Sequence, residues 1–179
     1  IWGAGVQRIS IGVQQMIFTP HDTQASSPWG PGQPHTSLLR DRPYSGLLLG
    51  TINLITDTDT TRSVFGIQVG IMGPAAMGRQ LQNGFHNLIG DTENQGWSHQ
   101  LQNQPIFQVQ GGRTWRLPLA SVGGIEFDML PSAAAAIGDY QIYGRLGDTF
   151  RIGQGLDSDF GTPTIQASGT DGSDAYKAR

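Results

Sequence analysis

The sequence predicts an all-β protein, an antiparallel transmembrane β-barrel with one short helical insertion. Several segments of ten or more residues alternate between apolar and polar side chains. Glycine contributes 26 of 179 residues, and only 14% of residues are charged. An apolar face opposite a face of Arg, Gln, Thr and Gly is typical of strands between lipid and a polar lumen. A soluble barrel or sandwich, whose polar face is merely solvated, is the alternative that this pattern leaves open.

Composition excludes several classes of function. The net charge of −3 argues against nucleic-acid binding, because no basic patch is available to neutralise phosphates. The chain has no cysteine, which excludes disulfides, thiolate metal sites and a cysteine nucleophile. No run of about 18 apolar residues is present, so no transmembrane helix is predicted. A transmembrane β-strand, however, needs only about 9–11 residues of alternating pattern.

The first strand is predicted over residues 6–18, where Ile9, Ile11 and Val13 face one way. A loop of Ser, Pro, Gly and Gln follows over residues 23–40, long enough to have a function of its own.

The remaining strands share the same two-residue period. In the strand predicted over residues 63–72, Gly66 and Gln68 lie on the face that we expect to be interior. Between the last two strands, Gly138-Asp139 is predicted to form a tight two-residue hairpin turn. These strands are predicted over residues 47–56, 63–72, 105–117, 124–137 and 140–152. About six strands are too few for a closed barrel, the smallest of which have about eight. We therefore expect residues 1–179 to form a single β-barrel domain that lacks strands at its N-terminal end, or at both ends.

One segment reads as a helix, from Pro74 to Ile89, with Gly90 just past its end. Gln82 and His86 lie four residues apart and project from one face. A separate apolar stripe is formed by Met77, Leu81, Phe85 and Leu88. A histidine on the one helix of a β-rich chain is a candidate for chemistry, although spacing alone also fits a surface helix with solvated polar residues.

Three groups of residues, in this order, resemble the bacterial outer-membrane lipid A 3′-O-deacylase family (LpxR-like). The resemblance extends from about residue 6 to residue 165 and includes Thr19-Pro20 after the first strand. The three groups are Asp41-Arg42-Pro43-Tyr44-Ser45-Gly46, the helix with Gly73-Pro74 and Gln82-Asn83-Gly84-Phe85-His86, and Gly96-Trp97 with Gln100.

The resemblance implies a twelve-stranded barrel in the outer membrane of a Gram-negative bacterium. It implies a monomeric, Ca²⁺-dependent hydrolase that removes the 3′-linked acyl group from lipid A in lipopolysaccharide. His86 matches the family's catalytic histidine, and Gln82 matches the glutamine one turn before it. An acidic residue also contributes, for which Glu93 is the first candidate and Asp91 the second, and both are candidate calcium ligands. The family's Asn-Asp pair and hydroxyl residue lie on early strands that have no counterpart in this chain.

Ester hydrolysis needs an activated water and a stabilised oxyanion. Histidine can take a proton near neutral pH, and Ca²⁺ can polarise an ester carbonyl. A Gly-x-Ser-x-Gly elbow is missing from the sequence, so a serine hydrolase is not indicated. Two other interpretations stay open: a non-catalytic outer-membrane barrel, porin-like or structural, and a soluble β-rich binding module. Trp97 is expected to be an interfacial anchor, or to flank an acyl chain. A set of arginines is expected to make the lumen positive, or to be ordinary lumen charges: Arg113, Arg145 and Arg151.

Overall fold

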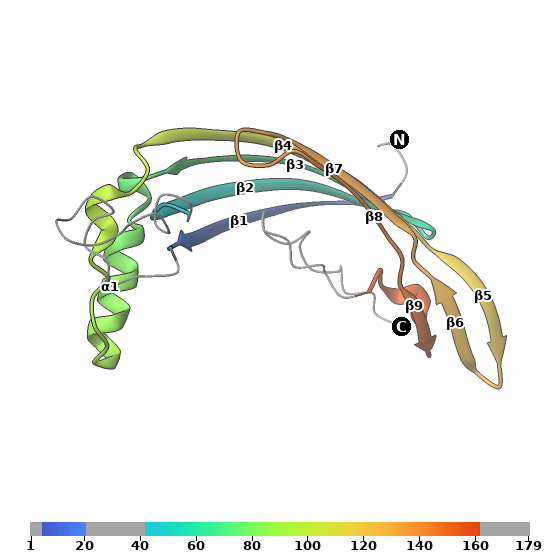
Figure 1. Ribbon diagram of the computed structural model, residues 1–179. Coiled ribbons are helices and arrows are strands. Elements are labelled where there is room, and N and C mark those ends of the chain that lie inside the picture. The colour runs from blue at the N-terminus through green and yellow to red at the C-terminus, as the bar shows by residue number, and fades with distance from the viewer. Residues whose placement is uncertain (1–4, 21–41, 162–179) are drawn as a thin grey trace. The chain divides into compact units, whose positions relative to one another are not determined.

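A computed structural model describes residues 5–20 and 42–161, and this part of the chain is all-β with one α-helix (Figure 1). It divides into two compact units. The helix unit comprises residues 13–20, 42–50 and 69–106; the sheet unit comprises residues 5–12, 51–68 and 107–161. The predicted loop at residues 23–40 lies outside the described residues. None of the helices in the described segments is long and apolar enough to span a bilayer.

Four long strands contribute to both units: β1 (Val6–Phe18), β2 (Ser45–Asp57), β3 (Thr61–Met72) and β4 (Gln104–Trp115). In the helix unit, the connection from β3 to β4 forms a 3₁₀-helix η2 (Pro74–Ala76), the helix α1 (Gly78–Ile89) and a second 3₁₀-helix η3 (Gly96–His99). Figure 1 shows α1 at the ends of the four strands. The candidate histidine therefore lies on α1, within the longest described connection between strands.

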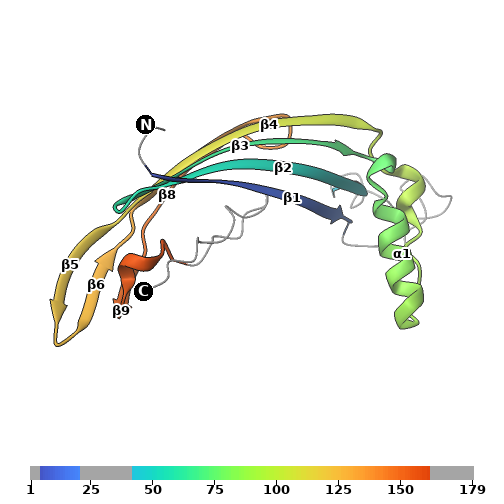
Figure 2. The same cartoon turned by 180° about the vertical axis from the view of Figure 1, so that it is seen from behind.

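The sheet unit adds five shorter strands and one 3₁₀-helix, and Figure 2 shows β5, β6 and β9 side by side. The pairs β4–β7, β7–β8, β5–β6 and β6–β9 are antiparallel. The added elements are β5 (Leu117–Val122), β6 (Ile125–Met129), β7 (Ser132–Gly138), β8 (Tyr143–Gly147), β9 (Phe150–Gly153) and η4 (Leu156–Ser158).

The described strands form two open sheets. One has the order β1-β2-β3-β4-β7-β8, and the other has the order β5-β6-β9. Within the described residues, β1 and β8 are the edge strands of the six-stranded sheet and do not pair with each other. These strands alone therefore do not close a barrel. The all-β antiparallel class with one helix is confirmed, whereas barrel closure and twelve strands stay predictions.

Three predicted strands are each interrupted in the structure. The segments 105–117, 124–137 and 140–152 were expected to be continuous, but they divide into β4 and β5, β6 and β7, and β8 and β9. The interruptions are neighbours in space, because Trp115 donates its backbone N–H to Pro131 O (2.9 Å) and Leu130 donates to Thr149 O (2.8 Å). Pro131 has no N–H to continue the ladder. The break therefore follows from the register of three adjacent strands.

The predicted hairpin forms, since β7 pairs antiparallel with β8, but its predicted two-residue turn at Gly138-Asp139 is wrong. Gly138 is the last residue of β7, and residues 139–142 connect it to β8. Asp139 instead pairs with β4: its N–H donates to Phe107 O, and its carboxylate accepts from Phe107 N–H, both at 3.0 Å. A Cβ at position 138 would lie 2.4 Å from Phe107 O, so glycine here permits close approach of β4 and does not form a tight turn.

The alternation within β3 confirms the predicted interior face. Phe65, Ile67 and Val69 are exposed, while Gly66 is buried and the side chain of Gln68 is fully buried. Gln68 Nε2 donates to Thr51 Oγ1 on β2 at 3.0 Å. An exposed apolar face opposite a buried, hydrogen-bonded polar face is the reverse of a soluble sheet, and it is the arrangement of a strand between lipid and a polar lumen.

Candidate functional site

Helix α1 begins later than the sequence pattern predicts. Pro74 occupies the first turn of η2, and Met77 then takes a left-handed conformation (φ 59°) before α1 starts at Gly78. The end at Gly90 is confirmed, since Gly90 is left-handed (φ 75°) and its N–H contacts Asn87 O. A left-handed methionine is uncommon and is strained relative to glycine. The change of direction at Met77 sets how α1 lies against β2.

The start of α1 packs against β2 and η3 through glycines. A Cβ on Gly78 would lie 2.8 Å from Trp97 Cη2 and 2.9 Å from Gly46 Cα. A Cβ on Gly96 would lie 2.2 Å from Tyr44 Cε2. The rings of Tyr44 and Trp97 are 5.0 Å apart, centroid to centroid, and tilted by 51°. Residues from all three sequence groups behind the family resemblance thus form one contact cluster.

Trp97 is an interior residue of this cluster. Its side chain is only 2% exposed, so the prediction that it anchors the protein at a membrane interface is wrong. Its indole Nε1 donates a hydrogen bond to Gln82 Oε1 at 3.1 Å. A buried indole N–H needs an acceptor, and Gln82 supplies it. Gln82 is therefore not simply a solvated helix residue. Its side-chain oxygen accepts the bond from Trp97, and its amide NH₂ is the group that can donate a hydrogen bond to a ligand.

Asn83 attaches the inner face of α1 to the segment that returns toward β4. Its Nδ2 donates to Asn94 O (3.3 Å), and its Oδ1 accepts from the Asn94 backbone N–H (3.2 Å). Both side chains are buried. Reciprocal bonds between buried groups define the rotation of α1 about its axis. The sequence analysis assigned no role to Asn83. Its position between the two candidate residues Gln82 and His86 was the feature of the sequence that could have indicated one.

The two candidate carboxylates have different surroundings. Glu93 is half-buried, and its oxygens accept from Asn87 Nδ2 (2.8 Å) and Asn83 Nδ2 (3.4 Å). Asp91 is 60% exposed, its Oδ1 accepts from the Thr92 N–H (2.7 Å), and its Oδ2 lies 3.8 Å from His86 Nδ1. Glu93 thus holds α1 in place, while Asp91 is the carboxylate that faces the histidine.

One of the two ring nitrogens of His86, Nδ1, forms a hydrogen bond with the backbone. Its Nδ1 lies 2.8 Å from the carbonyl oxygen of Thr92, and its side chain is 21% exposed. A carbonyl only accepts, so Nδ1 must carry the hydrogen of this bond. Neutral His86 then has a bare Nε2, which is the tautomer of a general base. The Thr92 carbonyl is thereby an orienting group that sequence reasoning missed, since a backbone acceptor has no side-chain signature.

The described residues do not by themselves form a calcium site. Within these segments, no group of three or more histidine, cysteine, aspartate or glutamate side chains is placed to hold a metal ion. Calcium takes six to eight oxygen ligands. Glu93 uses its oxygens on the amides of Asn83 and Asn87, which leaves Asp91 as the better placed of the two predicted ligands.

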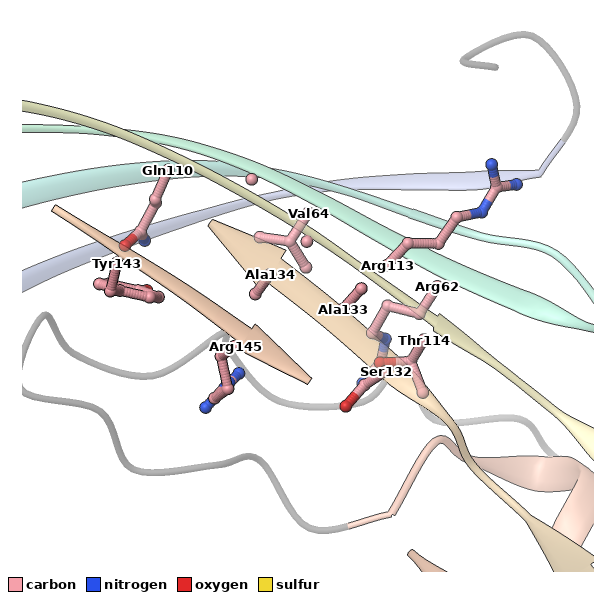
Figure 3. A pocket seen from close by; sticks show the side chains of 12 residues that line it. Arg62, Val64, Gln110, Arg113, Thr114, Ser132, Ala133, Ala134, Tyr143 and Arg145 are labelled. Atoms are coloured by element: carbon pink, nitrogen blue, oxygen red, sulfur yellow. The ribbon is translucent and has the colours of Figure 1, made fainter. Parts of the chain in front are cut away.

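A cavity of about 40 Å³ lies in the sheet unit. Figure 3 shows Tyr143, Arg145 and Ser132 on one side of the strands and Arg113 on the other, in agreement with the pairing of Gly112 with Ala134 and of Ala134 with Arg145. Arg113 lies over the ring of Trp115, 6.0 Å from its centroid. The expectation that Arg113 and Arg145 together make one lumen positive is therefore wrong, because they lie on opposite faces.

Arg151 is neutralised within the sheet unit. Its Nε donates to the buried Asp128 (2.8 Å), and its Nη1 donates to Asp159 (2.5 Å). Nearby, Arg116 lies over the ring of Phe160, 4.2 Å from the centroid. These contacts satisfy buried charges on the polar face of the β5-β6-β9 sheet, so Arg151 is part of the packing and not a free lumen cation.

Comparison with known proteins identifies the family. The family described as outer membrane protein LpxR matches residues 2–178. The chain belongs to this family. The family resemblance and the outer-membrane location predicted from the sequence are thus confirmed. No curated protein matches the chain.

One solved structure, LpxR from Salmonella typhimurium, matches with a TM-score of 0.68 at 23% sequence identity. The match covers 83% of this chain and 48% of that one, so this LpxR family member spans about half the length of that relative. At this identity the likeness shows the fold alone. It supports the antiparallel β architecture with α1.

Proposed function

We propose that this LpxR family member acts as a Ca²⁺-dependent outer-membrane esterase that removes the 3′-linked acyl group from lipid A. The observation that carries the proposal is the hydrogen bond from His86 Nδ1 to the Thr92 carbonyl, which leaves Nε2 free to take a proton. Membership of the family supports the substrate class and the location.

In the proposed reaction, a water oxygen attacks the carbonyl carbon of the acyl ester while His86 Nε2 takes a proton from that water. The bond between the carbonyl carbon and the sugar oxygen then breaks. The proton passes from His86 to the sugar oxygen, so the products are a fatty acid and a free 3′-hydroxyl. The Thr92 carbonyl, 2.8 Å from His86 Nδ1, accepts a hydrogen bond from the imidazolium that forms in between.

Gln82 supplies a donor to the developing oxyanion in this proposal. Its Oε1 is occupied by the Trp97 N–H, so its Nε2 group is the polar group available to a substrate. A donor already in place costs no reorganisation when charge develops. Glu93 acts through Asn83 and Asn87, which hold α1 and thus position Gln82 and His86.

The calcium requirement is part of the proposal. Bound Ca²⁺ supplies polarisation of the ester carbonyl. Asp91 is the ligand that we propose from the described residues, and the other oxygen ligands must come from elsewhere in the protein or from water, because the described side chains do not form a complete site. Chelation followed by titration with Ca²⁺ and, separately, with Mg²⁺ tests this requirement directly.

The test uses the complete protein in detergent–lipid A micelles, with mass spectrometry to detect loss of the acyl group. We expect His86→Ala to lower the rate at least about 100-fold, the usual contribution of general-base catalysis. His99→Ala is the matched control, because His99 is an exposed histidine of the same unit whose ring contacts Ser98 Oγ (2.9 Å).

Full activity of His86→Ala would show that another group is the base. If the wild-type protein releases no fatty acid at any calcium concentration, the esterase proposal fails, and the non-catalytic barrel becomes the better interpretation.

A further inference from the structure

The apolar side of α1 is exposed. Leu81, Phe85 and Ile89 are 50%, 58% and 58% exposed, and Leu88 is 82% exposed. The polar side of the same helix carries Asn83, one of the two buried residues of α1. This is the reverse of a surface helix on a soluble protein, which turns its apolar stripe toward the core. An exposed apolar helix face of this kind needs an apolar partner.

Contacts on the polar side hold α1 in this orientation. Asn83 exchanges two hydrogen bonds with Asn94, Asn87 donates to Glu93 at 2.8 Å, and Gln82 accepts from Trp97 at 3.1 Å. Rotating α1 to bury its apolar stripe would break all of these bonds and leave buried polar groups unsatisfied. These hydrogen bonds thus keep Phe85 and Ile89 exposed.

Part of the apolar stripe runs directly beside the catalytic candidates. Gln82 and His86 form one line of residues four apart, and Phe85 and Ile89 form the adjacent line. Leu81 extends the apolar line by one more turn, so that it covers about 12 Å of the helix axis from Leu81 to Ile89. Leu88, two positions from His86, projects toward the opposite edge of the stripe.

We propose that Leu81, Phe85 and Ile89 bind the acyl chain of the ester that is hydrolysed, and that they set which chain lengths are cleaved. This inference rests on the proposed esterase function of His86. An ester whose carbonyl carbon is attacked by water beside His86 can lay its acyl chain along this neighbouring line of residues. Those residues are apolar and form a continuous exposed strip that a fatty acyl chain can follow.

The surroundings favour a lipid chain over a protein partner. Helix α1 carries no acidic residue, and its one permanently charged residue is Arg79, at the end remote from His86. Val13 on β1 and Val69 on β3, in the same unit, are also exposed apolar residues, at 79% and 55%. Exposed apolar side chains on strands of an outer-membrane family face lipid. The strip on α1 thus belongs to a unit whose other exposed apolar residues are suited to acyl chains.

The experiment measures kcat/KM for two substrates of the complete protein, a long-chain and a short-chain 3-O-acyl ester of a phosphorylated glucosamine. We expect Phe85→Ala and Ile89→Ala each to lower the long-to-short ratio of kcat/KM about tenfold, because each removes apolar contact with the distal part of a long chain. Phe85→Trp is expected to shift the preference toward the shorter chain by filling part of the strip.

Leu88→Ala is the matched control, since it removes an even more exposed apolar side chain of the same helix. We expect its ratio to equal that of the wild type. A wild-type ratio in Phe85→Ala and Ile89→Ala would overturn the inference. An equal fall in Leu88→Ala would also overturn it, because the stripe would then act only as a general membrane contact.

The outcomes separate this inference from the proposed function. If the wild-type protein cleaves neither ester, the esterase proposal itself fails. If it cleaves both while the variants keep the wild-type ratio, only the acyl-chain assignment fails. All of the substituted side chains are exposed, so the variants leave the packing of α1 on Tyr44 and Trp97 intact.

Discussion

The indole Nε1 of Trp97 donates to Oε1 of Gln82 across 3.1 Å. The donor is on η3 and the acceptor is on α1, fifteen residues earlier in the chain. Because the tryptophan is buried, this bond sets which end of the Gln82 amide faces outward. The pair links the packing of the helix unit to the chemistry that we propose for it.

Replacing Trp97 by Phe is expected to lower kcat for deacylation about threefold to tenfold. The substitution keeps an aromatic ring against Tyr44 and Gly78 and removes only the N–H, so the cost is that of one hydrogen bond, about 0.5–1.5 kcal/mol. A double-mutant cycle measures the coupling: Trp97→Phe should have little further effect in a Gln82→Ala background. Trp115→Phe, at an exposed tryptophan, is the control. Additive effects would show that Trp97 does not act through Gln82.

Gly96→Ala is expected to displace α1 and abolish activity. The added methyl would lie 2.2 Å from Tyr44 Cε2, and a buried ring has no space to yield. Gly84→Ala is the comparison within α1 itself, because a Cβ there meets no atom within 4 Å and alanine favours a helix by up to about 1 kcal/mol. Limited proteolysis of residues 73–103 and the deacylation rate are the measurements. A protected, active Gly96→Ala protein would contradict the packing described for Tyr44.

The two carboxylates near His86 are expected to respond differently to neutralisation. Asp91→Asn should raise the calcium concentration needed for half-maximal activity, since Asp91 is the exposed carboxylate that faces His86. Glu93→Gln should lower the maximal rate with little change in that concentration, because it replaces an acceptor of the Asn83 and Asn87 bonds by a donor. Calcium titrations of both variants distinguish them. An unchanged calcium dependence of Asp91→Asn would remove Asp91 as a ligand.

Asp128→Asn is expected to destabilise the sheet unit by about 3 kcal/mol. The substitution leaves the guanidinium of Arg151 without its buried partner, and breaking a buried pair costs about 3–5 kcal/mol. The lower end applies because Asp159 still contacts Arg151. Asp148→Asn, at an exposed carboxylate that accepts from the Thr149 N–H, is the control. The free energy of unfolding in urea with lipid micelles is the measurement, and equal stability of the two variants would exclude a structural role for the Asp128 pair.

Local patterns in the chain were sufficient to place the elements and their faces. The two-residue period of residues 63–72 identified β3 and put Gln68 inside, because side chains alternate across any strand. The four-residue spacing of Gln82 and His86 put both on one helix face, because that spacing is intrinsic to a helix. The three short sequence groups were sufficient to identify the family.

The tertiary structure decided what those residues contact. The break near Arg116, Pro131 and Thr149 depends on the register of neighbouring strands, which no single segment contains. The burial of Trp97 depends on its contacts with Gly78 and with the ring of Tyr44, which lie on other segments of the chain. Likewise, the tautomer of His86 is selected by a backbone carbonyl six residues away, and a backbone group leaves no trace in the amino-acid sequence. The period of apolar and polar residues is a property of a single segment of the chain. The contacts of a side chain depend on two segments that are distant in sequence, so only the tertiary structure could assign them.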